Sequence, residues 1–498
     1  MRKKISNLTT MRKIIVPLLL FCSITATGQT IVHIDTDTTY QTIDNFGASD
    51  AWSCQFVGNW PEQKKNAIAD WLFSTDTTAT GQPMGIGLSM WRYNIGAGTA
   101  EQGDSSAIRD EWRRTYNWQS QSGQLWFLQA AKQRKVKQFL AFLNSPPVNL
   151  TINGKGFANK GNCNISPEKY DALANYTADV ITGIHKKTGI LFDYISPVNE
   201  PQWEWSDGGQ EGCPYNNEQI SGVTKSISET FIERKLSTKI IIGEAGKLDY
   251  LYAKADKPAK GEQITAFFNN GSPDYLDNLP NIRHTISGHS YFTTSPAPAA
   301  IRIRNDLSKN IAAVKNLTFW QSEYCILGDN AGEINGEKRD YGMDAALYLA
   351  RVIYYDLAVA NAAAWQYWLA VSPYDYKDGL IYIDKNTKDG QYRDSKMMWA
   401  LGNYSRFVRP GAKRIKTTVS DNDTLLVSTY QNTDRTITIV AVNSSKDVMN
   451  ISLDYKKGKI KKLRSYITSD TGNLEPIAVD NNINIPARSV VTITGNIK

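Results

Sequence analysis

Between residues 43 and 370 the chain alternates short β-rich runs with stretches of helical character, and this alternation restricts the fold most. Eight candidate strands can be read from it: Ile43–Ser49, Ile86–Ile95, Val136–Asn144, Phe192–Val198, Lys239–Gly243, Thr285–Tyr291, Leu317–Glu323 and Ala362–Leu369. Apolar stripes at helical spacing lie between them, as in the helix predicted after Pro167. Eight strand–helix units are the number that closes a (β/α)8 barrel. We therefore predict an α/β fold, a TIM barrel over residues 43–410.

The pattern changes after Arg409-Pro410-Gly411. Residues 411–498 contain alternating apolar runs at Thr424–Tyr430, Thr436–Val442, Ile460–Ile467 and Ser489–Thr494, separated by Asn, Asp, Gly and Ser. Such runs without a helical period predict a small antiparallel β domain. The β-prone segment 29–42 precedes the first barrel strand and is expected to add one strand to that domain.

The first 28 residues have the pattern of a secretory signal peptide. Arg12 and Lys13 precede the apolar run Ile14–Ala26, and Ala26-Thr27-Gly28 forms a small-x-small cleavage site. The run is too short to span a membrane, and no later stretch reaches the ~20 apolar residues that a span needs. We expect export to the periplasm or the exterior. Cys22 leaves a lipid anchor at the cell surface open, although the bulky Leu19-Leu20-Phe21 argues against a lipobox.

The net charge of +7 comes mostly from this signal segment, which holds five basic residues and no acidic ones. Without it, 51 basic and 49 acidic residues remain, so the mature chain is near +2. Nucleic-acid binding normally needs a basic patch on the mature domain. We therefore expect no nucleic-acid partner. We also expect no transmembrane segment and a monomer.

The cysteines and histidines do not form a metal motif. Four cysteines follow the signal segment, Cys54, Cys163, Cys213 and Cys325, with no CxxC pair among them, and the chain has only four histidines. We predict no metal site and no cofactor. One or two disulfides are compatible with export, but their pairing does not follow from the sequence. A serine esterase is disfavoured because the chain lacks a Gly-x-Ser-x-Gly elbow.

Two glutamates stand where predicted strands end. Glu200 lies in Asn199-Glu200-Pro201 after the fourth strand, and Glu323 closes the seventh. Barrel enzymes place their chemistry at these strand ends. Glycoside hydrolysis needs two carboxyl groups on opposite sides of the sugar carbon. Separate ion pairs near loops are the alternative, but both glutamates at strand ends would then be a coincidence.

A set of motifs in this order resembles glycoside hydrolase family 30. The motifs are Phe46-Gly47-Ala48-Ser49, Asn144-Ser145-Pro146-Pro147, Asn199-Glu200-Pro201, Ser322-Glu323-Tyr324, Tyr404 to Gly411 and Pro486 to Val490. The resemblance implies a barrel joined to a β-sandwich that takes an N-terminal strand. It also implies a retaining glycosidase whose partner is a polysaccharide or oligosaccharide substrate. The run Gln210-Glu211-Gly212-Cys213 is similar to the branch of endo-β-1,6-galactanases, which act on arabinogalactan side chains. A β-1,6-glucanase or a xylanase stays open. So does a carbohydrate-binding protein with an inactive barrel, although neither glutamate is replaced.

The resemblance also implies roles for residues at the strand ends. Glu200 is expected to be the acid/base and Glu323 the nucleophile, with Arg92 and Tyr291 beside Glu323 to keep it ionised. Glu200 needs a raised pKa so that it can hold and release a proton.

The remaining candidates are expected to bind the sugar. They are Asp50, Trp52, Asn144, Asn199, Trp203, His289, Trp365 and Trp368. Asn199 is placed for the sugar 2-hydroxyl, and His289 for Glu200 or a sugar hydroxyl. The tryptophans offer flat apolar faces on which sugars stack, and Trp91 and Trp205 are further candidates of this kind.

Overall fold

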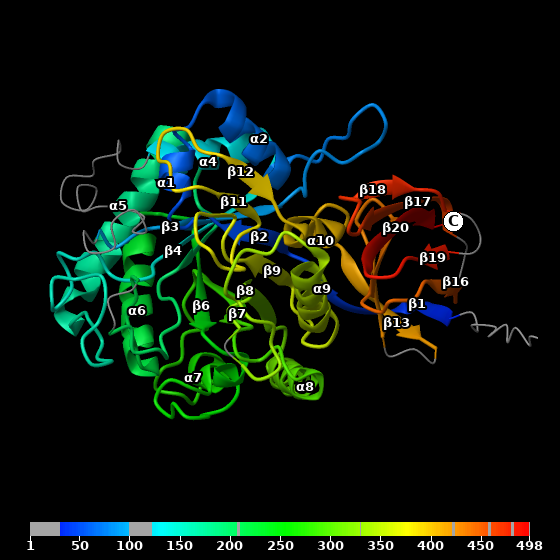
Figure 1. The fold of residues 1–498 in the computed structure, drawn as a ribbon. Helices are drawn as coiled ribbons and strands as arrows, with labels where there is room; N and C mark the ends of the chain where they lie inside the picture. The colour runs from blue at the N-terminus through cyan, green and yellow to red at the C-terminus, as the bar shows by residue number, and fades with distance from the viewer. Residues whose placement is uncertain are drawn as a thin grey trace, which may run out of the picture.

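A computed structural model of the protein describes residues 30–98, 122–206, 210–328, 330–420, 424–456, 460–479 and 483–497. Figure 1 shows two parts, a barrel with its helices and a smaller all-β part that contains the C-terminus. The predicted signal peptide, with Cys22, lies outside the described residues.

The barrel closes as predicted. Its strands are β2 (Asn45–Ser49), β3 (Met90–Asn94), β4 (Gln138–Phe142), β5 (Tyr194–Ser196), β6 (Lys239–Ala245), β7 (Ile282–His289), β8 (Thr318–Glu323) and β9 (Ala364–Tyr367). Neighbours in this order pair in parallel, and β9 pairs with β2 to complete the ring. The carboxyl ends of all the barrel strands therefore meet at one rim, where barrel enzymes hold their active sites.

Helices surround this barrel. They are α1 (Cys54–Val57), α2 (Glu62–Phe73), α4 (Ser122–Gln133), α5 (Tyr170–Thr188), α6 (Asn217–Glu233), α7 (Gln263–Phe268), α8 (Ala297–Ala313), α9 (Met343–Ala358) and α10 (Lys396–Ser405). The predicted stripe on α5 is buried, because the residues at its apolar spacing face the barrel. None of the described helices is both long and apolar enough to cross a bilayer.

The all-β part is one nine-stranded sheet around its own core. The strands are β1 (Thr30–Thr42), β13 (Lys413–Val419), β14 (Leu425–Gln431), β15 (Thr436–Asn443), β16 (Met449–Tyr455), β17 (Ile460–Thr468), β18 (Glu475–Ile477), β19 (Ile483–Ile485) and β20 (Ser489–Ile497). Strand β1 pairs with β13 on one side and β16 on the other, so the N-terminal segment joins the C-terminal β-sandwich as expected. A separate small sheet near the barrel holds β10 (Val371–Ser372), β11 (Ile381–Ile383) and β12 (Tyr392–Asp394).

The two parts are bonded to each other through α10. The amide of Asn403 donates to Thr468 at 2.7 Å, and the hydroxyl of Thr492 donates to the Asn403 carbonyl, also at 2.7 Å. All three side chains are fully buried. Polar groups buried in this way must be satisfied, so these bonds fix the sandwich against the barrel.

Candidate active site

A cavity of about 280 Å³ opens at the carboxyl-end rim of the barrel. Its lining comprises Trp52, Asn144, Asn199, Glu200, Trp203, Trp205, Gln210, Glu211, Tyr291, Phe292, Glu323, Leu327 and Trp368. Aromatic faces with a few convergent polar groups are typical of small-molecule and sugar sites. Both predicted catalytic glutamates lie in this lining.

Glu200 is held by the loop that leaves β5. Its backbone has a positive φ of 44°, a conformation that costs a non-glycine residue about 1–3 kcal/mol. Two bonds fix it there: the Glu200 N–H donates to the Glu244 carbonyl at 2.8 Å, and the Trp205 indole N–H donates to the Glu200 carbonyl at 3.0 Å. The residue is only 7% exposed. The loop thus keeps Glu200 in a strained position at the cavity wall.

Glu323 is the last residue of β8 and accepts two hydrogen bonds. Arg92 of β3 donates from Nη1 to Oε2 at 2.5 Å, and the Tyr291 hydroxyl donates to Oε1 at 3.2 Å. Arg92 is fully buried and its guanidinium lies 3.7 Å from the centre of the Phe142 ring. The ion pair and the hydroxyl each bind one oxygen of the carboxylate and so fix its orientation. Glu323 is therefore in surroundings that suit a nucleophile.

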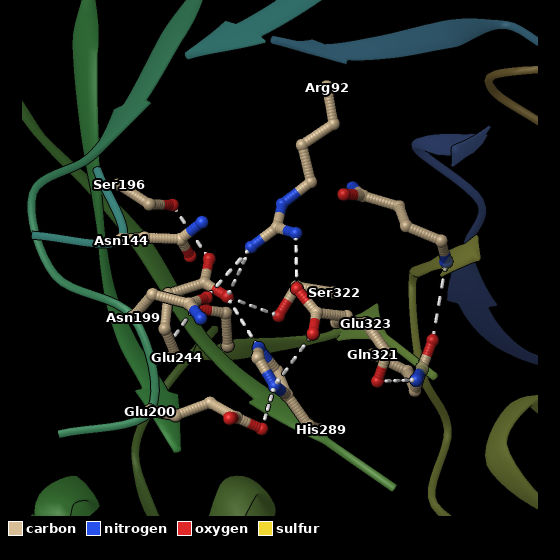
Figure 2. Close-up of polar contacts among 12 residues, drawn as sticks. Arg92, Asn144, Ser196, Asn199, Glu200, Glu244, His289, Gln321, Ser322 and Glu323 are labelled. Atoms are coloured by element: carbon tan, nitrogen blue, oxygen red, sulfur yellow. Dashed lines mark hydrogen bonds and ion pairs between the residues drawn. The ribbon is translucent and has the colours of Figure 1, made fainter. Parts of the chain in front are cut away.

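His289 connects Glu200 to a third glutamate. Its Nδ1 lies 2.9 Å from Oε1 of Glu200, and its Nε2 lies 2.9 Å from Oε2 of Glu244 (Figure 2). Burial alone would lower the pKa of His289, but the charge of Glu323 and the bonds to Glu200 and Glu244 outweigh it and raise the pKa to about 10. His289 is therefore a cation at neutral pH, with both ring N–H groups donating.

Glu244, near the end of β6, is fully buried and is not part of the cavity lining. Burial would raise its pKa, but the hydrogen bond from His289 and the charge of Arg92 lower it to about 2. Ser196 and Ser322 also donate to it, at 2.6 and 2.7 Å. Glu244 is therefore ionised at neutral pH, and it holds the Nε2 side of the His289 ring in place.

Sequence reasoning missed Glu244 because it ended the strand at Gly243, two residues before the end of β6 at Ala245. The sequence did contain an indication of this residue. Glu244 comes directly after the apolar run Ile240–Gly243, just as Glu323 stands at the end of its own strand. A charged residue on such a strand requires buried partners.

Burial raises the pKa of Glu200, and the charge of Glu323 raises it further, while His289 acts in the opposite direction. Because the upward effects win, Glu200 is a carboxyl group with a raised pKa, unlike Glu244 behind it. We call Arg92, Glu200, Glu244, His289 and Glu323 the mouth cluster.

Other predicted residues lie on the cavity wall. Asn199 accepts a bond from Arg92 at 3.0 Å, and Asn144 is 3.5 Å from Asn94. Trp52 and Trp368 meet edge to face, with ring centres 5.2 Å apart. Trp203 packs edge to face on Phe292 in the same lining.

The structure places Asp50, His289 and Trp365, and the further candidate Trp91, outside this lining. Asp50 is fully buried, where it accepts bonds from the Asn94 backbone at 2.7 Å and from Gln124 at 3.2 Å. Burial raises its pKa to about 8. Trp365 donates its indole N–H to Asp356 at 2.9 Å, and Trp91 stacks on Phe127. Conversely, Gln210, Glu211, Phe292 and Leu327 line the cavity without having been singled out as sugar-binding residues.

Within the described residues, Glu200, His289 and Glu323 are a group whose ligand atoms lie close enough to hold a metal ion, all within 4.8 Å of one another. A metal would need His289 to lose a proton, because only the neutral ring is a ligand. The raised pKa of His289 opposes this loss, and the positive charge of Arg92 beside Glu323 opposes the approach of a metal cation. The donors therefore fit a proton-transfer site better than a metal site.

A closed parallel barrel with paired carboxyl groups at its rim defines the class of barrel glycosidases. Comparison with known proteins gives the family. Residues 29–382 match the O-glycosyl hydrolase family 30 model, and residues 411–493 match the glycosyl hydrolase family 30 β-sandwich domain. The chain belongs to glycosyl hydrolase family 30 and is a glycoside hydrolase.

Three similar proteins illustrate the relationship. An endo-β-1,6-galactanase of Hypocrea rufa is 24% identical over 434 residues, covering 82% of this chain and 81% of its own. A conserved exported protein from Bacteroides fragilis has a crystal structure that covers 93% of this chain and 100% of its own, with a TM-score of 0.83 and 32% identity. The catalytic domain of xylanase C from Talaromyces cellulolyticus, also of family 30, covers 94% of this chain and 100% of its own, with a TM-score of 0.69 and 22% identity.

Proposed function

We propose that this glycoside hydrolase cleaves a β-linked polysaccharide with retention of configuration, with Glu200 as acid/base and Glu323 as nucleophile. One observation supports this mechanism most directly: an oxygen of Glu200 and an oxygen of Glu323 lie within 4.8 Å of each other. Retaining enzymes hold their carboxyl groups about 5–5.5 Å apart, whereas inverting enzymes leave about 6.5–9.5 Å for a water molecule. The short separation favours direct attack by Glu323.

In the first step, the ionised Glu323 attacks the anomeric carbon while protonated Glu200 gives its proton to the leaving oxygen. Arg92 and Tyr291 aim the Glu323 carboxylate through its two oxygens. In the second step Glu200, now ionised, takes a proton from water, and that water releases the sugar from Glu323. The His289 cation steadies the ionised Glu200 between the two steps.

The charges of the mouth cluster agree with this cycle. At rest, the cations Arg92 and His289 balance the anions Glu244 and Glu323, with Glu200 protonated. In the covalent intermediate Glu323 is an uncharged ester and Glu200 is ionised, so the sum is again zero. Since net charge in a buried site is costly, a cycle that keeps the sum at zero is favoured.

The substrate that we propose is a β-1,6-galactan, cleaved within the chain. Support comes from the similarity to the Hypocrea rufa endo-β-1,6-galactanase over most of both chains, and from the Gln210–Cys213 run, of which Gln210 and Glu211 line the cavity. The tryptophans of the lining would stack on apolar sugar faces. We also propose export through the signal at residues 1–28, in line with the similar exported protein of Bacteroides fragilis.

A substrate panel tests the specificity. The purified enzyme is incubated with β-1,6-galactan, β-1,6-glucan and glucuronoxylan, and the products are separated by chromatography. We expect a ladder of galacto-oligosaccharides from the first polymer and little release from the others. Release from glucan or xylan alone would reassign the substrate. No release from any polymer or aryl glycoside would contradict the mechanism itself.

Azide distinguishes the two carboxyl roles. In Glu200→Ala an activated aryl glycoside still forms the covalent intermediate, because its leaving group needs little protonation. Azide, which needs no base, should then release a glycosyl azide of retained configuration. In Glu323→Ala azide should instead occupy the vacated face and give the inverted product. The opposite pair of outcomes would exchange the two roles.

A further inference from the structure

Two loops beside the cavity each contain a cysteine, and the two thiols are neighbours. Cys163 lies in the loop before α5, and Cys213 lies in the loop between β5 and α6. Both thiols are free, and each shifts the pKa of the other, so the two are neighbours. The N–H of Asn164, next to Cys163, also donates to the Cys213 sulfur at 3.3 Å.

Backbone hydrogen bonds hold the two loops side by side, so the position of the two thiols is fixed by the loops that contain them. The Ala158 N–H donates to the Trp205 carbonyl at 2.8 Å, and the Gly212 N–H donates to the Gly156 carbonyl at 2.9 Å. Cys213 is fully buried, whereas Cys163 is partly exposed. The Cys163 thiol can therefore react with an external reagent, whereas the Cys213 thiol is shielded from it.

We propose that Cys163 and Cys213 form a disulfide when the protein meets a disulfide oxidant, such as that of an oxidising export compartment. The Cys163 thiolate attacks the oxidant's disulfide and expels one thiolate. The Cys213 thiolate then attacks the Cys163 sulfur of this mixed disulfide and expels the second thiolate. Both protein thiols lose a proton and together two electrons, and the oxidant becomes two thiols.

The local chemistry suits this order of attack. The hydrogen bond with Cys213 lowers the pKa of the Cys163 thiol, and the charge of Lys260 contributes, so the exposed thiol is the better nucleophile. Burial raises the pKa of Cys213. The other two cysteines differ: Cys54 begins α1, and Cys325 follows β8 with its sulfur 3.7 Å from the Tyr291 hydroxyl.

The bond would secure one wall of the active-site cavity. The loop that contains Cys213 also provides Trp205, Gln210 and Glu211 to the lining. The Glu211 carboxylate accepts bonds from the backbone of Ala97 and Gly98, at 2.8 and 3.2 Å. A cross-link between residues 163 and 213 would keep this wall in place when the protein is warmed, because it limits the loosened states of both loops.

Peptide mapping tests the bond directly. The full chain is equilibrated with oxidised and reduced glutathione, denatured, alkylated without reduction, digested and analysed by mass spectrometry. We expect a cross-linked peptide joining Cys163 to Cys213, with Cys54 and Cys325 alkylated. Alkylation or glutathionylation of both Cys163 and Cys213, or a bond between any other pair, would overturn the proposal.

Thermal unfolding gives a second measurement. A reductant should lower the melting temperature of the oxidised protein by about 5 °C, as expected for a bond that closes a long loop. In Cys163→Ser the reductant should have no effect, whereas in Cys54→Ser, the matched control, the shift should remain. An equal shift in Cys163→Ser and wild type would contradict the proposal. These results do not depend on the substrate or on the catalytic roles.

Discussion

Two buried ionic clusters lie on opposite sides of the end of β7 and have very different compositions. His289 turns into the barrel mouth and joins the mouth cluster. The next residue, Ser290, turns outward to the helix layer, where its hydroxyl bonds both oxygens of Asp356 on α9 at 3.0 Å. Arg304 of α8 and Trp365 of β9 donate to the same carboxylate, at 2.7 and 2.9 Å. We call these four residues, Ser290, Arg304, Asp356 and Trp365, the Asp356 cluster.

The comparison shows what distinguishes a working site from a structural one. In the Asp356 cluster one cation meets one carboxylate, and all four side chains are fully buried. In the mouth cluster two cations meet three carboxyl groups beside a cavity, so one carboxyl group must gain and lose a proton. Burial of charge is common to both clusters. The surplus carboxyl group and the open cavity belong to the mouth cluster.

Glu323→Gln should have the largest effect. The amide keeps the shape of the side chain but cannot attack carbon, so kcat should fall by roughly three to five orders of magnitude. The melting temperature should change little, because the buried Arg92 keeps Glu244 as an ionic partner. Hydrolysis of an aryl glycoside and calorimetry measure the two, with the exposed Glu337→Gln as control. More than a few per cent of residual activity in a clean preparation would contradict the nucleophile assignment.

Asp356→Asn should show the reverse pattern. It leaves the Arg304 cation buried without its partner, which should cost about 3–5 kcal/mol of unfolding free energy. At a temperature where the variant is folded, kcat should stay within about a factor of three of wild type. Asp344→Asn is the control on the same helix, since Asp344 is an exposed partner of Arg488. If Asp356→Asn lost activity as fully as Glu323→Gln while staying folded, the distinction between the clusters would fail.

His289→Gln should change the pH dependence. His289 lowers the pKa of Glu200, so removing the cation raises that pKa. Because Glu200 must be protonated to donate, the alkaline limb of kcat/KM should move to higher pH. Ser290→Ala, which alters the Asp356 cluster, should leave the limb in place. A limb that moved to lower pH in His289→Gln would contradict the role of the cation.

The same variant changes how stability depends on pH. Since the pKa of His289 is about 10 in the folded protein and 6.5 ordinarily, its contribution to stability is complete below pH 6.5 and is lost as the pH rises to about 10. The low pKa of Glu244, about 2 against 4.5, gives stability above pH 4.5 that is lost toward pH 2. Urea unfolding of His289→Gln between pH 6.5 and 10 should lack the first of these losses.

Metal removal should have the smallest effect. Exhaustive treatment with EDTA should leave activity unchanged, because the proposed chemistry uses only proton transfer and a carboxylate nucleophile. Activity that was lost and then restored by one added cation would place a metal at the mouth cluster, provided that the melting temperature did not change with it.

The sequence indicated much of this site because strand ends are visible in it. Glu200 and Glu323 follow apolar runs, and a parallel barrel brings all such ends to one rim. Glu244 follows the same rule, but it was missed because its strand extends to Ala245. Trp365 shows the opposite error: it lies on a barrel strand, yet its side chain turns outward to Asp356.

The sequence by itself determined the number of barrel strands, the change to a β domain near residue 411 and the two glutamates of the rim, since each depends on local periodicity or on a short motif. Only the tertiary structure decided which side chains face the cavity and which face the helices. Successive side chains of a strand point to opposite sides, so a difference of one residue separates His289 from Ser290. Partners such as Arg92 and Glu244, or Arg304 and Asp356, lie far apart in the chain, and nothing local specifies that they meet. The protonation states of these groups depend on their being buried next to one another, and they are buried next to one another only once the barrel has closed.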